Sequence, residues 1–350
     1  MTLTDFRTLG RSGLVVSPLC LGTMTFGTSR WGTDEAESRA VFDAYRDAGG
    51  NFVDTADVYS GGTSEEMLGR FIAETNSRDE IVLATKFGFH AGGDNPHAGG
   101  NGAKNIHRAL EASLGRLGTD YVDLYWMHVW DGVTPVEEIC RTLGGLAQAG
   151  KIRYFGFSDM PAWVAMKAAT IASERGVSGP IAMQVEYSLA ARDIEREHLP
   201  VALEGGMGVV PWSPLAGGFL SGKYTREDTG DSGRLSGDNP FGDSKFTDRN
   251  WDLLDVMRTV AEEQGRSLAQ VALAWLGARS GVVSTLVGAS RVEQLHDNIA
   301  ALEVALTPEQ TARLDKASAN APGFTDMLAA PAVRRMIFGG NDVRQWNGNR

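Results

Sequence analysis

Three apolar, β-branched runs in the first part of the chain each end in a polar side chain. The run 51–54 ends in Asp54, with Tyr59 five residues further on, and the run 83–86 ends in Lys86. A third run, 125–128, ends in His128. The carboxyl ends of parallel strands meet at one edge of a sheet, where ligands bind. If the three runs are such strands, a carboxylate, an ammonium, an imidazole and a phenol share one site.

This combination of groups suits proton transfer. A lysine that emerges from a buried strand is costly unless it is paired, and Asp54 on the preceding run is the natural partner for Lys86. A free phenol has a pKa of ~10, and a nearby ammonium and imidazole favour the phenolate and draw that pKa toward neutrality. Tyr59 is therefore a candidate general acid. His128 would donate a second hydrogen bond to a carbonyl oxygen or share the proton relay.

Each of these residues alone has an ordinary structural explanation. Asp54 could be a helix N-cap, Lys86 a solvated strand end and His128 a histidine satisfied within the core. Their coincidence at successive strand ends favours the catalytic interpretation.

Short apolar runs alternate with segments of helical periodicity along most of the chain. The predicted strands are 17–22, 51–54, 81–85, 122–127, 152–157, 181–185, 208–212 and 285–288. The predicted helices are 33–48, 64–74, 105–117, 135–149, 161–174, 193–204, 248–264, 267–279 and 292–302. Such alternation requires parallel strands joined by right-handed crossovers.

Two architectures are compatible with this alternation. A doubly wound sheet that binds a dinucleotide usually carries a G-x-G-x-x-G turn, and the chain has none. A closed (β/α)8 TIM barrel fits better and takes ~250 residues. The surplus falls in tracts 88–104 and 214–247, which would be long loops at the C-terminal face, and in an irregular tail from about residue 318. We therefore predict one domain over residues 1–350, with an N-terminal β-hairpin around the turn Gly10–Gly13 that closes the barrel floor.

Composition narrows the classes of function. The 350 residues are 42% hydrophobic and 22% charged, as in an ordinary globular protein, and the net charge of −11 is the wrong sign for binding nucleic acid. There is no long apolar stretch or secretion signal, and Cys20 and Cys140 form no disulfide framework. We expect a cytoplasmic protein that binds neither nucleic acid nor membrane, with both cysteines buried.

At this point the sequence resembles the aldo-keto reductase family, from Leu3 to about Leu306. The spacing of Asp54 and Tyr59, together with Lys86 and His128, matches that family's catalytic residues. Further matching segments, in chain order, are Leu19–Met24, Gly150–Arg153, Gly156–Asp159, Gln184–Tyr187, Pro211–Leu215 and Gly288–Gln294.

The resemblance implies a barrel oxidoreductase that reduces aldehydes or ketones with NADPH, and less commonly with NADH. Tyr59 would protonate the carbonyl oxygen, Lys86 and Asp54 would tune it, and His128 would orient the substrate. The resemblance also implies cofactor-binding residues along the chain. Gly22, Thr23 and Asp54 would lie at the catalytic group, Ser158, Asp159 and Gln184 would hold the carboxamide, and Trp212 or Tyr187 would stack on the nicotinamide. Ser213, Leu215 and Gly217 would line the pyrophosphate, Gly288, Ser290 and Arg291 would lie toward the 2′-phosphate, and Gln294 and Asn298 would lie near the adenine.

Two positions depart from the family pattern. Residue 159 is Asp where Asn is more frequent, and residue 185 is Val where Asn is common. An ionised Asp159 accepts hydrogen bonds but cannot donate one, so it would bind only the amide NH2 of a carboxamide.

Large apolar residues at or near strand ends are candidates for the walls of a substrate pocket. We assign Met24, Trp31, Phe87 and Trp130 to this group. His90 and His97 lack a third ligand, so we expect no metal. The apolar tail 336–346 would fold over the barrel mouth or into a contact between subunits, which leaves a homo-oligomer open.

Rivals from other classes are a non-catalytic, cofactor-binding regulatory subunit on the same fold, such as the channel subunits of this family, and a barrel lyase or hydrolase. The lyase or hydrolase would need a metal or a Schiff-base lysine, and Lys86 could in principle serve as that lysine. The substrate itself, a small-molecule carbonyl compound, is not specified by these patterns.

Overall fold

Parallel strands alternate with helices in a computed structural model that describes residues 1–28, 32–227, 235 and 245–343. Its main sheet has eight parallel strands, β3 (Leu19–Gly22), β4 (Phe52–Asp54), β5 (Val82–Phe87), β6 (Val122–Met127), β7 (Ile152–Ser158), β8 (Ala182–Gln184), β9 (Gly208–Val209) and β10 (Thr285–Val287). They lie in the order β10-β3-β4-β5-β6-β7-β8-β9. A parallel bridge between Val209 and Val282 joins the two ends, so the sheet closes into the predicted barrel.

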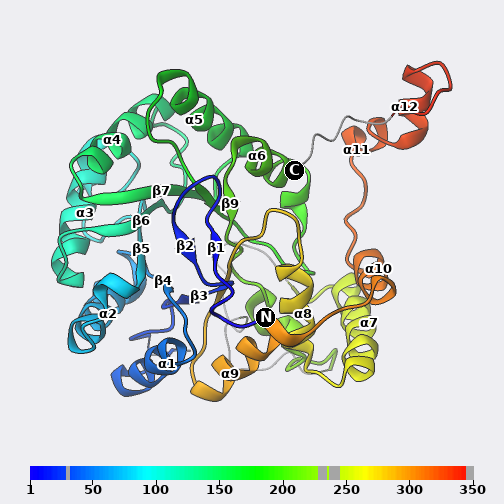
Figure 1. Cartoon of the computed structure of the whole chain (residues 1–350), viewed down its shortest axis with the longest axis horizontal. Coiled ribbons are helices and arrows are strands. Elements are labelled where there is room, and N and C mark those ends of the chain that lie inside the picture. Colours follow the sequence, from blue (N-terminus) through cyan, green and yellow to red (C-terminus); the bar gives the residue numbers. More distant parts are fainter. Residues whose placement is uncertain (29–31, 228–234, 236–244, 344–350) are drawn as a thin grey trace. The chain divides into compact units, whose positions relative to one another are not determined.

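Helices surround the strands (Figure 1). Their bounds are α1 (Glu35–Asp47), α2 (Thr63–Glu74), α3 (Ala103–Leu117), α4 (Val136–Gln148), α5 (Ala162–Arg175), α6 (His198–Gly205), α7 (Asp248–Gln264), α8 (Leu268–Gly277), α9 (Val292–Ala300) and α10 (Pro308–Ala317). Their starts follow local capping chemistry. The side chain of Asp34 accepts from the amide of Glu37 at the start of α1, and Glu37 bonds back to the cap.

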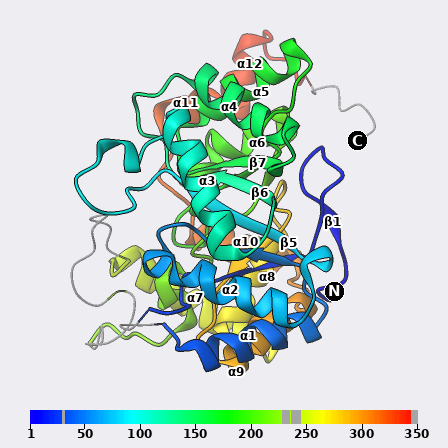
Figure 2. The same ribbon diagram turned by 90° about the vertical axis from the view of Figure 1, so that its left-hand side faces the viewer.

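An N-terminal hairpin packs against the inside of the barrel, as predicted. Strands β1 (Arg7–Thr8) and β2 (Val15–Val16) pair antiparallel. Leu9, Leu14 and Val16 join the interior residues of the barrel in one apolar cluster. Figure 2 shows β1 at one end of the barrel and the loop that follows β5 at the other. The hairpin therefore closes the end opposite the loops that follow the strands.

The barrel interior is filled rather than hollow. Trp126 is fully buried, and its partner in register on β7 is Gly156. A Cβ atom at position 156 would lie 2.4 Å from Trp126 Cζ3, so only glycine fits there. A second apolar layer separates the strands from the helices, where Tyr45 on α1 donates to the carbonyl of Leu19 at 2.8 Å.

Cys20 and Cys140 are buried and free, as expected. None of the helices that the structure describes is both long enough and apolar enough to cross a membrane.

The structure corrects four expectations about the elements. Helix α10 was not predicted, although Thr307 and Gln310 form a capping box around Pro308. The helix expected over 193–204 divides into a 3-10 turn (Asp193–Glu195) and α6. The strand expected over 208–212 pairs in the sheet only at residues 208–209, and β5 extends past Thr85 to Phe87.

The chain from Met1 to Ser318 packs as one compact unit, and the residues from Ala319 onward form a second. The second unit contains α11 (Phe324–Leu328) and α12 (Pro331–Ile337), where the sequence suggested an irregular tail. Its exposed apolar residues include Phe324, Met336 and Ile337. A covering or subunit-contact role for this tail stays a prediction.

Candidate active site

A buried ion pair lies where β4 and β5 end. Lys86 is 0% exposed and Asp54 is 1% exposed, and the Lys86 ammonium bonds Asp54 Oδ2 directly. Lys86 also donates to the carbonyl of Thr55 at 2.9 Å. Gln184 on β8 donates to the other oxygen, Asp54 Oδ1, at 3.1 Å. Both carboxylate oxygens of Asp54 are therefore held, one by Lys86 on the adjacent strand β5 and the other by Gln184 on β8 across the barrel.

Burial of Lys86 alone would lower its pKa, but the Asp54 carboxylate outweighs it and holds that pKa above its usual value. Lys86 therefore stays protonated at neutral pH. A charged lysine inside a barrel is tolerated because its counter-charge is in direct contact.

Tyr59 begins the 3-10 turn Tyr59–Gly62 after β4. Its hydroxyl accepts a hydrogen bond from Lys86 Nζ at 3.3 Å, and the same nitrogen lies 4.9 Å from the ring centroid. The next residue, Ser60, has a left-handed φ of 50° and bonds the carbonyl of Phe26 at 2.9 Å. This turn directs the phenol toward the buried ammonium.

His128 follows β6 directly, and its backbone amide donates to the carbonyl of Phe87 at 2.8 Å. Its ring stands edge-on to Tyr59, with centroids 5.8 Å apart. Burial, and next the Lys86 ammonium, hold the pKa of His128 well below its usual value. Nδ1 of His128 has no partner among the described residues. The structure thus brings Asp54, Tyr59, Lys86 and a neutral imidazole together at one end of the barrel.

The residues beside this group differ in part from those expected. Phe87 is fully buried and packs on Tyr125 with centroids 4.8 Å apart, in the layer between strands and helices. That position argues against a role in the pocket wall, because side chains alternate along a strand and Lys86 points inward. Phe89, which the sequence reasoning missed, lies edge-on to His128 at 4.8 Å and is 38% exposed.

The other expected wall residues are placed as follows. Trp130 is half-buried, packs edge-on against Trp163 at 5.3 Å and leaves its Nε1 without a partner among the described residues. Met24 is half-buried in the loop after β3. Trp31 lies outside the described residues.

Ser158 at the end of β7 pairs in register with Gln184 on β8. The next residue, Asp159, has a φ of 43° and accepts from Trp212 Nε1 at 3.0 Å. Burial raises the pKa of Asp159 to about 6, against the opposing hydrogen bond from Trp212. One Asp159 oxygen is therefore already engaged by the indole, a contact that the sequence did not reveal.

Trp212 and Tyr187, the two candidates for stacking, differ in accessibility. Tyr187 is fully buried, donates to Glu195 at 2.6 Å and packs on Trp275. Trp212 is only partly buried. Of these two rings, Trp212 alone reaches the surface of the site.

Left-handed backbone is concentrated around the site. Of the five non-glycine residues with positive φ among the described residues, Ser60, Asp159, Ser213 and Ala216 lie in loops that follow strands. Strained backbone of this kind gathers where ligands are bound. Ser213 Oγ accepts from the amide of Gly217 at 3.2 Å, and Leu215 is half-buried in the same loop.

Side chains lie close to Gly217 and Gly218 in the same loop. A Cβ at Gly217 would meet Leu235 at 2.7 Å, and one at Gly218 would meet Lys223 Nζ at 2.9 Å. Lys223 is an exposed cation beside the predicted pyrophosphate residues that sequence reasoning did not select.

The loop after β10 carries the remaining candidates. Ser290 donates from its amide and its hydroxyl to Gln294 Oε1, at 3.0 and 2.9 Å. Arg291 is exposed at the N-cap of α9 and does not use its side chain as a cap. Gly288 is exposed, whereas Asn298 is buried on α9.

Gly22 and Thr23 lie at the end of β3, next to the end of β4. A Cβ at Gly22 would lie 2.6 Å from Cδ2 of Leu286, so a larger residue there would require the Leu286 side chain to move. Thr23 is fully buried, and its amide and hydroxyl both donate to the carbonyl of Asp54, at 2.9 and 3.1 Å. The geometry assigns Thr23 to holding the end of β4 rather than to direct ligand contact.

Asp57 is a buried carboxyl that sequence reasoning did not single out. It is 7% exposed, and its Oδ1 has no partner among the described residues. Burial, and next the carboxylate of Glu65, raise the pKa of Asp57 from 3.8 to about 7, while Arg116 and Arg108 oppose the rise. Because the pKa of Asp57 is higher in the folded protein than in the unfolded chain, the protonated carboxyl contributes fully to the free energy of unfolding at pH values below the unfolded pKa. This contribution is lost as the pH rises through the pKa of the folded state.

Replacing Asp57 with Asn should therefore raise the melting temperature above that of the wild type at about pH 8.5, with a smaller gain at about pH 5, where the unfolded carboxyl is already ionised but the folded one is not. The measurement is thermal unfolding at both pH values. Asp79→Asn, at an exposed position, serves as the matched control. An equal effect at the two pH values would contradict the shifted ionisation.

Within the part of the chain that the structure describes, no group of three or more His, Cys, Asp or Glu side chains is arranged to hold a metal ion.

Comparisons with known proteins find matches along most of the chain. The model of the aldo/keto reductase family matches residues 18–319. A norsolorinic acid reductase of Aspergillus flavus is 37% identical over 322 residues, covering 89% of this chain and 80% of the relative. An aryl-alcohol dehydrogenase [NADP(+)] of Phanerodontia chrysosporium is 34% identical over 334 residues, covering 90% and 86%. A probable voltage-gated potassium channel subunit beta of Oryza sativa subsp. japonica is 36% identical over 329 residues, covering 92% and 99%.

Proposed function

Because the chain belongs to the aldo/keto reductase family, we propose that it reduces the carbonyl group of an aldehyde or ketone to an alcohol, with NADPH as the reductant and Tyr59 as the general acid. The family, and the reductases and dehydrogenases among the relatives, support an oxidoreductase. The observation that carries the finer proposal is the 3.3 Å contact between Lys86 Nζ and the Tyr59 hydroxyl, beside a neutral His128.

The chain's own groups divide the work as follows. Tyr59 donates its proton to the carbonyl oxygen, and the Lys86 ammonium stabilises the phenolate that remains. Asp54 keeps Lys86 charged and fixed in position. A neutral imidazole carries one N–H, so His128 donates a second hydrogen bond to the same oxygen and orients it. When bound, the dihydronicotinamide supplies the hydride.

The residues present fit a nicotinamide. Gln184 uses its amide nitrogen on Asp54, which leaves Oε1 to accept from the carboxamide NH2. Ser158 lies opposite Gln184 and supplies a hydroxyl beside it. Trp212 offers a partly exposed ring for stacking, held by its hydrogen bond to Asp159. These contacts support Trp212 over Tyr187 as the stacking residue.

The preference for NADPH rests on the start of α9. Arg291 is exposed there beside Ser290, and the first amides of a helix favour an anionic group. We propose that these groups hold the 2′-phosphate, with Gln294 and Asn298 toward the adenine. Ser213, Leu215 and Gly217 would line the pyrophosphate, with Lys223 adding a positive charge.

Arg291→Met is expected to weaken NADPH binding by roughly ten- to hundredfold, because a charge-assisted hydrogen bond is lost, while NADH binding stays nearly the same. The measurement is the KM for each cofactor. Arg258→Met, at an exposed position on α7, is the control. An equal loss for both cofactors would remove Arg291 from the 2′-phosphate.

We propose aromatic aldehydes or ketones as the substrate class. The Phe89 ring stands edge-on to His128, and Trp130 follows His128 in the same loop, where its amide donates to the carbonyl of Asp159 at 3.4 Å. Offset or edge-on contacts between aromatic rings are favourable. The name of the aryl-alcohol dehydrogenase relative points the same way.

The direct test is oxidation of NADPH, followed by absorbance, with benzaldehyde and with hexanal. We expect turnover of both and a higher kcat/KM for benzaldehyde. Phe89→Ala should reduce that preference. Equal values in the wild type would contradict the aromatic class without affecting carbonyl reduction.

A regulatory subunit that binds the cofactor without turnover is the second candidate, supported by the similarity to the potassium channel subunit along 99% of that relative. NADPH binding without turnover of any carbonyl compound would favour it. The complete set of Asp54, Tyr59, Lys86 and His128 favours the enzyme.

A further inference from the structure

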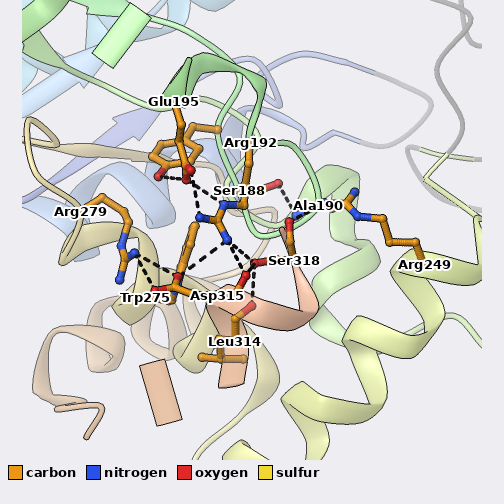
Figure 3. A network of polar contacts seen from close by, with 11 residues as sticks. Ser188, Ala190, Arg192, Glu195, Arg249, Trp275, Arg279, Leu314, Asp315 and Ser318 are labelled. Atoms are coloured by element: carbon orange, nitrogen blue, oxygen red, sulfur yellow. Dashed lines mark hydrogen bonds and ion pairs between the residues drawn. The ribbon is translucent and has the colours of Figure 1, made fainter. Parts of the chain in front are cut away.

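A polar network outside the catalytic group joins the loop after β8 to α8 and α10 (Figure 3). Its centre is Arg192, in the loop after β8, whose side chain is 12% exposed. The guanidinium donates to both carboxylate oxygens of Glu195, at 2.8 and 2.9 Å. It also donates to the carbonyl of Asp315 at 3.0 Å and to Ser318 Oγ at 2.7 Å. Arg192 therefore joins this loop to α10 and the residue that caps it.

Trp275 on α8 gives the network an aromatic centre. The Arg192 and Arg279 guanidiniums lie 5.2 and 4.5 Å from its ring centroid. Its Nε1 donates to Asp315 Oδ1 at 2.8 Å, and Arg279 donates to the same oxygen at 3.1 Å. The carboxylate of Asp315 thus balances the positive charges around the ring. These contacts connect the loop after β8 with α8 and α10.

The network reaches Trp212 through Tyr187. The Tyr187 hydroxyl donates to Glu195, the carboxylate that Arg192 holds, at 2.6 Å. The amide of Tyr187 donates to the carbonyl of Trp212 at 3.4 Å, and the amide of Trp212 donates to the carbonyl of Val185 at 3.1 Å. The backbone on both sides of Trp212 is therefore paired with the segment that Arg192 anchors.

We propose that Arg192 is a positioning residue for the cofactor: through Glu195 and Tyr187 it fixes the segment that sets where the Trp212 ring stands. This inference rests on the proposed function, since it takes Trp212 as the nicotinamide's stacking partner. Trp212 is only partly buried, so packing around its ring leaves it freer than a core tryptophan. Its place depends on the backbone pairing and on the bond to Asp159.

Arg192→Met is expected to raise the Kd for NADPH roughly two- to thirtyfold, the range for substitutions along a physical network that contact neither ligand. Isothermal titration calorimetry on the full chain measures it without turnover. At saturating NADPH, kcat should fall far less than the cofactor KM rises, because the catalytic group is untouched. Arg192→Lys keeps the charge but loses the bidentate contact, and should give an intermediate Kd.

A matched control separates positioning from general stability. Arg78 also pairs with a carboxylate, Asp123, at 2.9 Å, and its guanidinium lies 3.9 Å from the ring centroid of Tyr121. It contacts residues that precede β5 and β6, at the end of the barrel away from the site. Arg78→Met should lower the melting temperature and leave the Kd for NADPH unchanged. Equal Kd values in Arg78→Met and Arg192→Met would overturn the proposal.

A double-mutant cycle tests the route. If Arg192 acts through Trp212, Arg192→Met should change the Kd much less in a Trp212→Ala background than in the wild type. Fully additive changes would overturn the proposal, even with the proposed function intact. A wild-type protein that binds no NADPH would overturn the cofactor assignment and this inference together. If the wild type binds NADPH and both Arg192→Met and Arg192→Lys bind it with the wild-type Kd, only the inference about Arg192 is overturned.

Discussion

Tyr59→Phe is expected to lower kcat for carbonyl reduction by ~10²- to 10⁴-fold, the usual contribution of a general acid. The ring keeps its place beside His128, so the Kd for NADPH should stay the same. Only the hydroxyl that receives the Lys86 hydrogen bond is lost. Steady-state oxidation of NADPH measures the rate, and calorimetry measures the binding.

Tyr45→Phe is the matched control for that variant. The Tyr45 hydroxyl is buried between β3 and β4, where its one proton is shared between the carbonyls of Leu19 at 2.8 Å and Phe52 at 3.0 Å, and it accepts from the amide of Phe52 at 3.1 Å. Removing it should lower the free energy of unfolding by about 1–3 kcal/mol, because buried backbone groups lose their partner, with kcat unchanged. A Tyr59→Phe enzyme with wild-type kcat would refute the assigned general acid, whatever the fold.

Lys86→Met is expected to affect both stability and rate. Asp54, at 1% exposure, would be left as an unpaired buried carboxylate, and breaking a buried pair in this way costs about 3–5 kcal/mol. The rate should fall because Tyr59 loses the ammonium that stabilises its phenolate. Chemical denaturation and kcat at saturating NADPH measure the two effects.

A second substitution separates these effects. In Lys86→Met/Asp54→Asn the buried charge is gone, and the amide oxygen can still accept from Gln184. We expect this double variant to regain much of the lost stability relative to Lys86→Met while its kcat remains low. Recovery of activity along with stability would mean that the pair is structural and that Lys86 has no part in the chemistry.

Local patterns in the sequence were sufficient to predict the barrel and the catalytic group. Each strand that bears a proposed catalytic residue is a buried run with that polar side chain within one residue of its end, and a parallel barrel brings such ends to one face. The hairpin and the cap of α1 were predictable for the same reason, since turn and capping residues act over a few positions.

Two of the differences between prediction and structure could have been predicted from local sequence patterns. Phe87 and Phe89 both follow Lys86 closely. Alternation along the strand turns Phe87 away from the barrel interior, and the exposed Phe89 beyond the strand is the one that reaches His128. The capping box at Thr307 likewise marked α10.

The sequence by itself determined which chemical groups meet at the mouth of the barrel, because strand periodicity and turn residues are local properties of the chain. Only the tertiary structure decided how far Trp212 and Tyr187 are buried, the burial of Asp57, and the contact of Arg192 with Asp315 across more than a hundred residues. These depend on which side chains from distant elements exclude water around one another. No pattern within a short window of sequence records that.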